Sequence, residues 1–437
     1  MKWEIGKTLS SRLNEFLQQA ETVKRYRTHE TAFTRIRKLT FERVVALIMA
    51  GHKVAAQSAV MIGVQSSGAD ESWMATGSAY LQARAKLKPE LFIKLNQISC
   101  EAFYEDEPQK WLGHRLLGVD GTLLNLPDTP ELRAVFSIQK NQRHSYVQGQ
   151  SMVLHDLLND IGVAATLGPL TSESDDVLRH EIWSATQVGD VIVMDRGIHS
   201  YILFATAIRD KRDIIARCYS AGFAVIQAFR KSKDTQAMVE LQVPVDIATR
   251  VATLGLPSRI CVRLEKFVLP SGEIEVLLTT LLDTLAYPRE ALFEAYGKRY
   301  PGQEGFFNRI KNVFDLERFS SKSEQFIRQD VHAVIFLATY ESILSKPAQT
   351  IMDEQHAQSN NTTVPKVNHV TGYIALAHRV IQLLAIAHTD FSGVMAEITQ
   401  LLLLNPTRHV PNRSAPRHKR AIHRSVRHLR YTKRLTG

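Results

Sequence analysis

Three acidic residues, far apart in the chain, have the residue types and surroundings of a divalent-metal site. Asp120 follows the apolar run 116–119, and Asp195 follows the apolar run 191–194. Each run predicts a buried strand that ends at its acid, where a carboxylate is unfavourable unless its charge is used. A hard cation such as Mg²⁺ takes oxygen ligands, and a third carboxylate is then needed. The best third acid is Glu304, near the start of a predicted helix.

These acids point to chemistry on phosphodiesters. Asp120 and Asp195 are 75 residues apart, so only folding can bring them together. Three carboxylates that hold two Mg²⁺ ions about 4 Å apart can activate a water or a 3′-hydroxyl with one ion and stabilise the leaving oxygen with the other. Lys311 lies seven residues after Glu304, about two turns along the same helix face.

Simpler interpretations of the same acids stay open. A strand-end Asp often forms a turn or caps a helix. Glu304 could be an acid that favours the first turn of a helix. Glu294 and Glu317 lie nearby and could be ligands in its place.

The charge of the chain is concentrated at its C-terminus. The 437 residues carry a net charge of +10, and the segment 408–437 contains ten Lys and Arg residues and no acid. The rest of the chain is balanced, with 44 basic and 44 acidic residues. Such a block is typical of a tail that binds a polyanion, and it is also compatible with a solvated tail without a specific partner.

Other features favour the reducing interior of a cell. Cys100, Cys218 and Cys261 are scattered without metal or redox spacing, so structural zinc is not expected. No apolar run is long enough to span a bilayer, and the first residues lack the apolar core of a signal peptide. We expect a cytoplasmic protein with two or three domains and no membrane association.

The elements that would position the acids follow from hydrophobic periodicity. The N-terminal part reads as helical, with helices over 9–22, 41–49 and 77–87 and a basic cluster over 24–43; it could enter a DNA groove or be a bundle with a charged face. A mixed α/β core follows, with strands at 115–119, 151–154, 163–167 and 191–194 and helices at 173–185 and 201–209. Further strands are predicted at 224–228, 239–243, 259–264 and 276–282. Helices are then predicted at 288–299, from about 303 to 316 after a break at 301–302, and at 331–344 and 372–404.

Several segments resemble insertion-sequence DDE transposases of the IS-four family. The segments 117–122 and 127–130 resemble the region of the family's first Asp, 193–197 that of the second, and 278–283 with 287–288 the approach to the third acid. Tyr296, Arg299, Glu304 and Lys311 resemble the Tyr-Arg-Glu-Lys signature, and 37–41 and 82–87 resemble the N-terminal helical region. The family usually has three residues between Arg and Glu; here four intervene, and Gln303 stands at the usual Glu position. We place the extra residue at 301–302.

The resemblance implies an α/β fold with an RNase H-like mixed-sheet core and a β-strand insertion, flanked by an N-terminal helical domain and a C-terminal helical region with a basic tail. The implied domains are a helical DNA-binding domain (1–110), the first part of the catalytic core (111–212), a β-rich insertion (213–288), the second part of the core with the Glu helix (289–345), and the C-terminal region (346–437).

The resemblance also implies roles for single residues. Asp120 would touch both metal ions, and Asp195 and Glu304 one each. The residues expected to hold DNA phosphates near the scissile bond are Tyr296, Arg299 and Lys311, and those expected near the terminal DNA are Arg230 and Lys231. Some relatives stack a flipped base on a Trp of the insertion. No Trp occurs between Asp195 and Glu304 here, and the open alternatives are Phe223, Phe229, Tyr219 and Phe267.

The implied function is cut-and-paste DNA transposition that depends on Mg²⁺, with Mn²⁺ as a substitute. The expected partners are double-stranded DNA, both the terminal inverted repeats and the target, and a second copy of the chain in a homodimeric synaptic complex. A bacterial, nucleoid-associated location follows. Two alternatives stay open: an inactive or domesticated transposase that only binds DNA, and a metal-dependent nuclease without strand transfer.

Overall fold

The computed structural model describes residues 4–35, 37–50, 54–68, 73–140, 145–170, 180–195, 200–218, 223–269, 272–386 and 389–410. The greater part of the basic tail, Tyr219 and most of the helix predicted at 173–185 therefore lie outside the described residues. Among the described helices, none combines the length and the apolar character that a membrane crossing requires.

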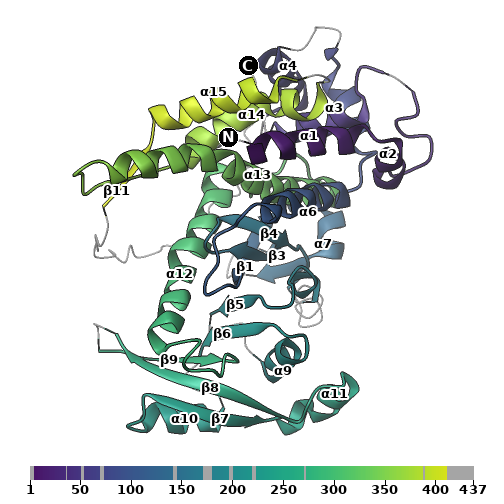
Figure 1. Cartoon of the computed structure of the whole chain (residues 1–437). Helices are drawn as coiled ribbons and strands as arrows, with labels where there is room; N and C mark the ends of the chain where they lie inside the picture. Colours follow the sequence, from purple (N-terminus) through teal and green to yellow (C-terminus); the bar gives the residue numbers. More distant parts are fainter. Residues whose placement is uncertain are drawn as a thin grey trace.

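A mixed sheet forms the centre of the molecule (Figure 1). Its first strands are β1 (Leu116–Leu126), β2 (Ser137–Lys140), β3 (Ser145–Asp156), β4 (Ile161–Ala165), β5 (Val191–Met194) and β6 (Asp213–Arg217). The strand β3 pairs antiparallel with β1, β2 and β4, whereas β5 is parallel to both β1 and β6. The resulting order β4-β3-β1-β5-β6 is that of an RNase H-like core. The predicted fold class is therefore confirmed.

Burial explains why the central strands form where the apolar runs predict them. All four residues of β5 are buried, as are the first four of β1. Strands that are covered on both faces read as continuous apolar runs, as these do. The helix α9 (Tyr201–Arg209) has the predicted bounds. It is capped by the Ser200 hydroxyl, which accepts from the Leu203 N–H at 3.3 Å.

The segment predicted as an insertion continues the same sheet. It contains β7 (Gln236–Gln242), η3 (Val245–Ile247), α11 (Ala248–Thr253), β8 (Arg259–Val268) and β9 (Ile274–Thr279). Strand β9 pairs antiparallel with β6, β8 with β9, and β7 with β8. The strand β6, which the sequence assigned to the insertion, thus lies between β5 and β9. The exact domain limits stay predictions.

The strand predicted at 224–228 is wrong, because this segment is the helix α10 (Ala224–Lys231). Its two buried residues, Ile226 and Phe229, are three positions apart. That spacing places both on one helix face, whereas a strand would point them to opposite faces. A short apolar run does not distinguish a helix from a strand by itself.

Helices cover the N- and C-terminal parts of the chain. The N-terminal helices are α1 (Glu4–Gln18), α2 (Ala20–Tyr26), α3 (Phe41–Met49), α4 (Ala56–Ser67), α5 (Gly77–Arg84) and α6 (Glu90–Glu105), and the short α7 (Pro130–Val135) precedes β2. The C-terminal elements are α13 (Glu324–Ala357), β10 (Val364–Lys366), α14 (His369–Ala385), α15 (Phe391–Leu404) and β11 (Thr407–His409). The helix predicted over 372–404 is two helices, and Asp390 caps the second by accepting from the Gly393 N–H at 3.1 Å.

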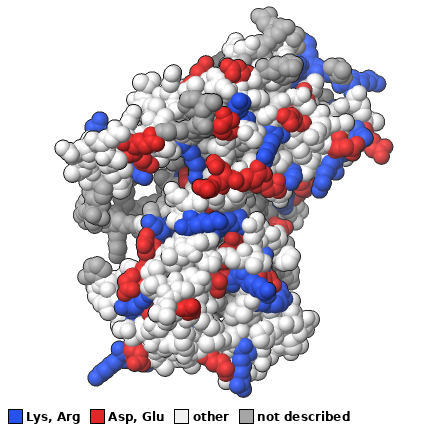
Figure 2. Space-filling view, viewed as in Figure 1, with Lys and Arg blue, Asp and Glu red and all other residues white. Residues whose placement is uncertain are grey.

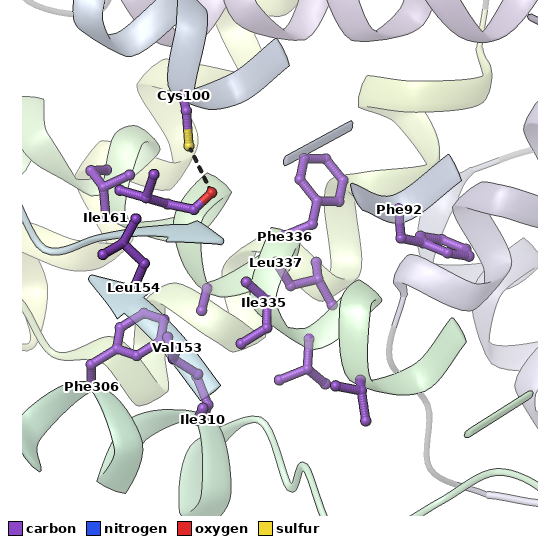
Figure 3. Packing of buried hydrophobic residues seen from close by; sticks show 14 of the residues in the cluster. Phe92, Cys100, Val153, Leu154, Ile161, Phe306, Ile310, Ile335, Phe336 and Leu337 are labelled. Carbon is purple, nitrogen blue, oxygen red and sulfur yellow. Dashed lines mark hydrogen bonds between the residues drawn. The ribbon is translucent and has the colours of Figure 1, made fainter. Parts of the chain in front are cut away.

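The long helix α13 joins the bundle to the sheet. It contacts α6, α14, α15 and β4. Figure 3 shows Ile335 of α13 on the side of Val153 of β3 and of Phe306, whereas Phe336 points away from them; all of these residues are buried. The N-terminal helices, the sheet and the C-terminal helices therefore share one hydrophobic core. On the face seen in Figure 2, basic and acidic side chains are interspersed over the bundle and the sheet.

One long helix connects the two ends of the molecule. The helix α12 (Arg289–Asn308) runs beside the sheet from the insertion to the bundle (Figure 1) and contacts β1, β3, β5 and β6. The predicted break at 301–302 is wrong, because α12 is continuous there. A π-helical segment, η4 (Arg309–Val313), follows instead. Packing along the sheet outweighs the helix-breaking tendency of a Pro-Gly pair.

Candidate active site

Pairing of β1 with β5 brings the two aspartates together. The parallel register places Val119 opposite Met194, so Asp120 and Asp195 follow on adjacent strands. Asp195 comes directly after β5, as predicted. Asp120 does not end its strand: β1 continues to Leu126 through its pairing with β3, and only the contact with β5 ends before Asp120. Asp120 thus lies where β1 loses its parallel neighbour, and its side chain is 31% exposed.

Two residues of α12 lie against the aspartates. The guanidinium of Arg299 approaches both carboxylates, with Nη1 3.7 Å from Asp120 Oδ2 and Nη2 3.5 Å from Asp195 Oδ2. The Tyr296 hydroxyl donates to Asp195 Oδ1 at 3.2 Å. The Arg299 side chain is only 10% exposed. Tyr296 and Arg299 are three residues apart, hence on one face of α12.

The surroundings of Asp120 shift the pKa of its carboxyl group. Burial raises its pKa above the ordinary value, and the carboxylates of Asp195 and Glu304 add to the rise. The N–H of Gly121, 2.8 Å from Asp120 Oδ1, and the charge of Arg299 act in the opposite direction. The Asp120 carboxylate is therefore partly buried near two like charges, and the charge of Arg299 offsets the rise in its pKa only in part.

Gln303 and Glu304 occupy different surroundings on α12. Gln303 is fully buried, and its Nε2 donates to the Val153 carbonyl at 3.3 Å. A Cβ atom on Gly118 would collide with the Gln303 side chain, so glycine at this position lets α12 lie close to β1. Glu304 is exposed and close enough to Asp120 to raise its pKa. Of the two, only Glu304 is an acid with access to solvent.

The other acids that the sequence left open have partners elsewhere. Glu294 forms an ion pair with Lys298 at 3.4 Å, one turn along α12. Glu317 Oε1 accepts from the Asn125 N–H at 3.4 Å, near the far end of β1.

The remaining predicted residues divide into two groups. Lys311 lies in η4, and its Nζ donates to the Leu123 carbonyl at 3.4 Å, three residues after Asp120 on β1. Arg230 and Lys231 lie in α10, beside β7 at the far end of the sheet from the bundle (Figure 1). Arg230 donates to the Ile274 carbonyl at 2.5 Å. The structure thus brings Lys311 toward the aspartates and places Arg230 and Lys231 in the extended part of the sheet.

The aromatic residues considered for base stacking are largely covered. Phe229 and Phe267 are buried, and the Phe267 ring stacks on Phe293 with 4.5 Å between centroids. Phe223 is partly buried against the core.

The donor set suits divalent ions, although Arg299 now stands between two of the acids. Among the described residues, no three His, Cys, Asp or Glu side chains are close enough together to hold a metal ion. The guanidinium of Arg299 forms ion pairs with both Asp120 and Asp195. The carboxylates of Asp120, Asp195 and Glu304 nevertheless offer hard oxygen ligands, the donor type that Mg²⁺ and Mn²⁺ take.

A second polar feature lies in the N-terminal helices. A groove with a volume of about 1040 Å³ runs between the segment 31–39 and α5. Its basic lining residues are Arg35, Arg37, Lys38 and Lys86, and the described residues that line it include no acid. Arg84, at the end of α5, is buried and pairs with Asp330 of α13 at 2.8 Å.

Comparison with known proteins yields one related sequence. Over 266 residues the chain is 24% identical to transposase InsG for insertion sequence element IS4 of Escherichia coli (strain K12). The match covers 59% of this chain and 58% of InsG, so it spans less than two thirds of the relative. The resemblance predicted from the motifs is thereby confirmed. No family model matches the chain.

A solved structure overlaps the chain more loosely. The piggyBac transposase in its synaptic complex with hairpin DNA superposes with a TM-score of 0.45 and 11% identity, over 93% of this chain and 84% of that one.

Proposed function

We propose that the protein is a DNA transposase that cuts and joins phosphodiester bonds at the inverted-repeat ends of an insertion sequence. The observation that carries the proposal is the convergence of Asp120 and Asp195 on adjacent strands, under a helix that bears Tyr296, Arg299 and Glu304. The identity with InsG supports the same function.

The acids would hold two Mg²⁺ ions, with Mn²⁺ as a substitute. Bound there, the ions would lower the pKa of a water molecule and stabilise the leaving oxygen. Asp120 would contact both ions, and Asp195 and Glu304 one each. Water would attack the phosphorus at the element's end, the P–O3′ bond would break, and a 3′-hydroxyl would leave. That hydroxyl would then attack a second phosphodiester to free the element and later to join it to a target.

Cationic residues on both sides of the acids would hold the DNA. Lys311 and Arg299 would bind phosphates near the scissile bond. Such phosphate contacts fix the position of the DNA strand relative to the acids. The basic residues of the groove along α5 would bind the backbone of the terminal repeat. Each Lys or Arg that meets a phosphate releases counterions, so this binding is expected to weaken steeply with salt. Two copies of the chain would pair the two ends.

The proposal is tested with the purified protein and duplexes from the ends of its own element. The Asp120→Asn variant should still bind these duplexes and lose Mg²⁺-dependent cleavage, since an amide would replace the carboxylate that is proposed to hold both ions. Lys298→Gln, on the exposed side of α12, is the control and should cleave normally. Cleavage by the Asp120→Asn variant would remove this residue from the mechanism. Joined products distinguish a transposase from a nuclease without strand transfer.

One observation favours a second candidate, a DNA-binding protein without catalysis. Gln303, at the family's usual Glu position, is buried where α12 packs against β1. It lies against Gly118, two residues before Asp120 and therefore on the same face of that strand. An amide there cannot supply the third carboxylate. Tight binding of the repeats without nicking, in both Mg²⁺ and Mn²⁺, would support this candidate over the first.

A further inference from the structure

Arg299 occupies an unusual electrostatic position for a residue expected to bind DNA. Its guanidinium is shared by Asp120 and Asp195, and its side chain is 10% exposed. In its expected role Arg299 would bind a DNA phosphate. In the structure it pairs with two carboxylates instead. One guanidinium cannot serve both at once.

The contacts of Arg299 with the acids are loose. Its shortest distances to the two carboxylates, 3.7 and 3.5 Å, exceed the 2.7–2.9 Å typical of a charge-assisted hydrogen bond. Its Nε is buried and has no hydrogen-bond partner among the described residues. By contrast, the Arg115 guanidinium donates two hydrogen bonds to the Asp190 carboxylate, at 2.8 and 2.6 Å. The two ion pairs of Arg299 are therefore longer than close hydrogen bonds, so a partner that bonds the guanidinium more closely, such as a phosphate, can compete with the two carboxylates.

The acids in turn need a cation. The carboxylates of Asp195 and Glu304 raise the pKa of Asp120, so like charges lie close to this residue. Tyr296 supplies only a neutral hydroxyl to Asp195. Among the described residues, Asp120 and Asp195 form their ion pairs with Arg299. Removing that charge would leave two adjacent carboxylates facing each other, which strongly favours capture of another cation.

We propose that Arg299 is a stand-in cation: in the DNA-free protein it competes with divalent ions for Asp120 and Asp195, and a bound DNA phosphate releases them by taking the guanidinium. The inference rests on the proposed metal site and adds to it an order of events. Metal binding and DNA binding favour each other, because each removes a competitor of the other. Such coupling is reciprocal, so it can be measured from either side. The coupling would keep divalent ions from binding to Asp120 and Asp195 until a DNA strand is bound.

The first test measures Mn²⁺ binding to the DNA-free protein by electron paramagnetic resonance, with no catalytic readout. Arg299→Gln should bind Mn²⁺ about tenfold more tightly than the wild type, a change of about 1.4 kcal/mol. Lys298→Gln removes a positive charge at the neighbouring position, on the exposed face of α12. Its Mn²⁺ affinity should stay within about twofold of the wild-type value. Adding Asp120→Asn to Arg299→Gln should abolish the gain. Thermal unfolding with and without Mn²⁺ should show a larger stabilisation for Arg299→Gln.

The second test measures DNA affinity in EDTA, where no metal contributes. Asp120→Asn should strengthen binding of a short duplex by freeing Arg299 as well as by removing negative charge. In the Arg299→Gln background only the second effect remains, so the same change should strengthen binding less. A double-mutant cycle isolates the difference.

The outcomes separate this inference from the proposed function. Equal Mn²⁺ affinities for the wild type and Arg299→Gln, both lost with Asp120→Asn, would overturn the stand-in role and leave the metal site intact. No Mn²⁺ binding at this site in any variant would overturn both. If Arg299→Gln does not fold, Arg299→Lys replaces it; it keeps a charge without the fork and should show a smaller gain, and no gain would count against the stand-in role.

Discussion

Replacing Arg84 should destabilise the fold without a direct effect on DNA contacts. Arg84 Nε donates to Gln329 Oε1 at 2.8 Å, Nη1 to Ser320 Oγ at 2.7 Å and Nη2 to Asp330 Oδ1 at 2.8 Å. The Arg84 and Asp330 side chains are 3% and 5% exposed. An Arg84→Met variant would bury the Asp330 charge without its partner, which costs about 3 to 5 kcal/mol.

The corresponding shift in melting temperature follows from the size of the chain. An unfolding entropy of about 2.1 cal/mol/K per residue over 437 residues gives about 0.9 kcal/mol/K, so the loss corresponds to about 3 to 5 °C. Differential scanning calorimetry measures it. Arg84→Met combined with Asp330→Leu should recover most of the loss, because the unpaired charge is then removed as well. An unchanged melting temperature together with weaker DNA binding would refute the burial argument.

Three further predictions concern the groove, a buried histidine and the third acid. Changing Lys38 and Lys86 to Gln should leave the melting temperature unchanged and reduce the slope of log affinity against log salt by about 2 in fluorescence anisotropy; an unchanged slope would exclude phosphate contacts in the groove. Burial, and secondarily the charge of Arg328, lowers the pKa of His332 to about 4. The unfolded chain then binds the extra proton between pH 6.5 and 4, so stability should fall by about 3 kcal/mol as the pH is lowered through that range. The free energy of unfolding of His332→Leu, measured with urea, should not show this loss between pH 6.5 and 4. A pH dependence identical to that of the wild type would contradict the prediction. Glu304→Gln should abolish Mg²⁺-dependent nicking and Gln303→Glu should not restore it in that background; rescue would transfer the third-acid role to position 303.

Local patterns predicted the parts of the fold in which neighbours along the chain decide the structure. The helices at 41–49 and 201–209 match α3 and α9, and the apolar runs before Asp120 and Asp195 match buried strands. The adjacency of the two aspartates required the parallel register of β1 and β5, which no local pattern contains.

Tertiary contacts decided the remainder. Arg84 sits in a segment that reads as a basic helix face, yet its ion-pair partner lies 246 positions away. The helix α12 continues across 301–302 because it packs along four strands, and the irregularity appears later as η4. The sharing of Arg299 by Asp120 and Asp195 depends on the same packing. Residue types thus indicated which side chains matter, whereas their partners depended on the assembled sheet.

The most direct test of the metal site is a crystal structure of the protein with DNA and Mn²⁺, using anomalous scattering to locate the ions. The account predicts two peaks about 4 Å apart, bounded by the carboxylates of Asp120, Asp195 and Glu304, with the Arg299 guanidinium turned to a phosphate. Peaks bound elsewhere, or a Glu304 carboxylate directed away from both ions, would contradict it.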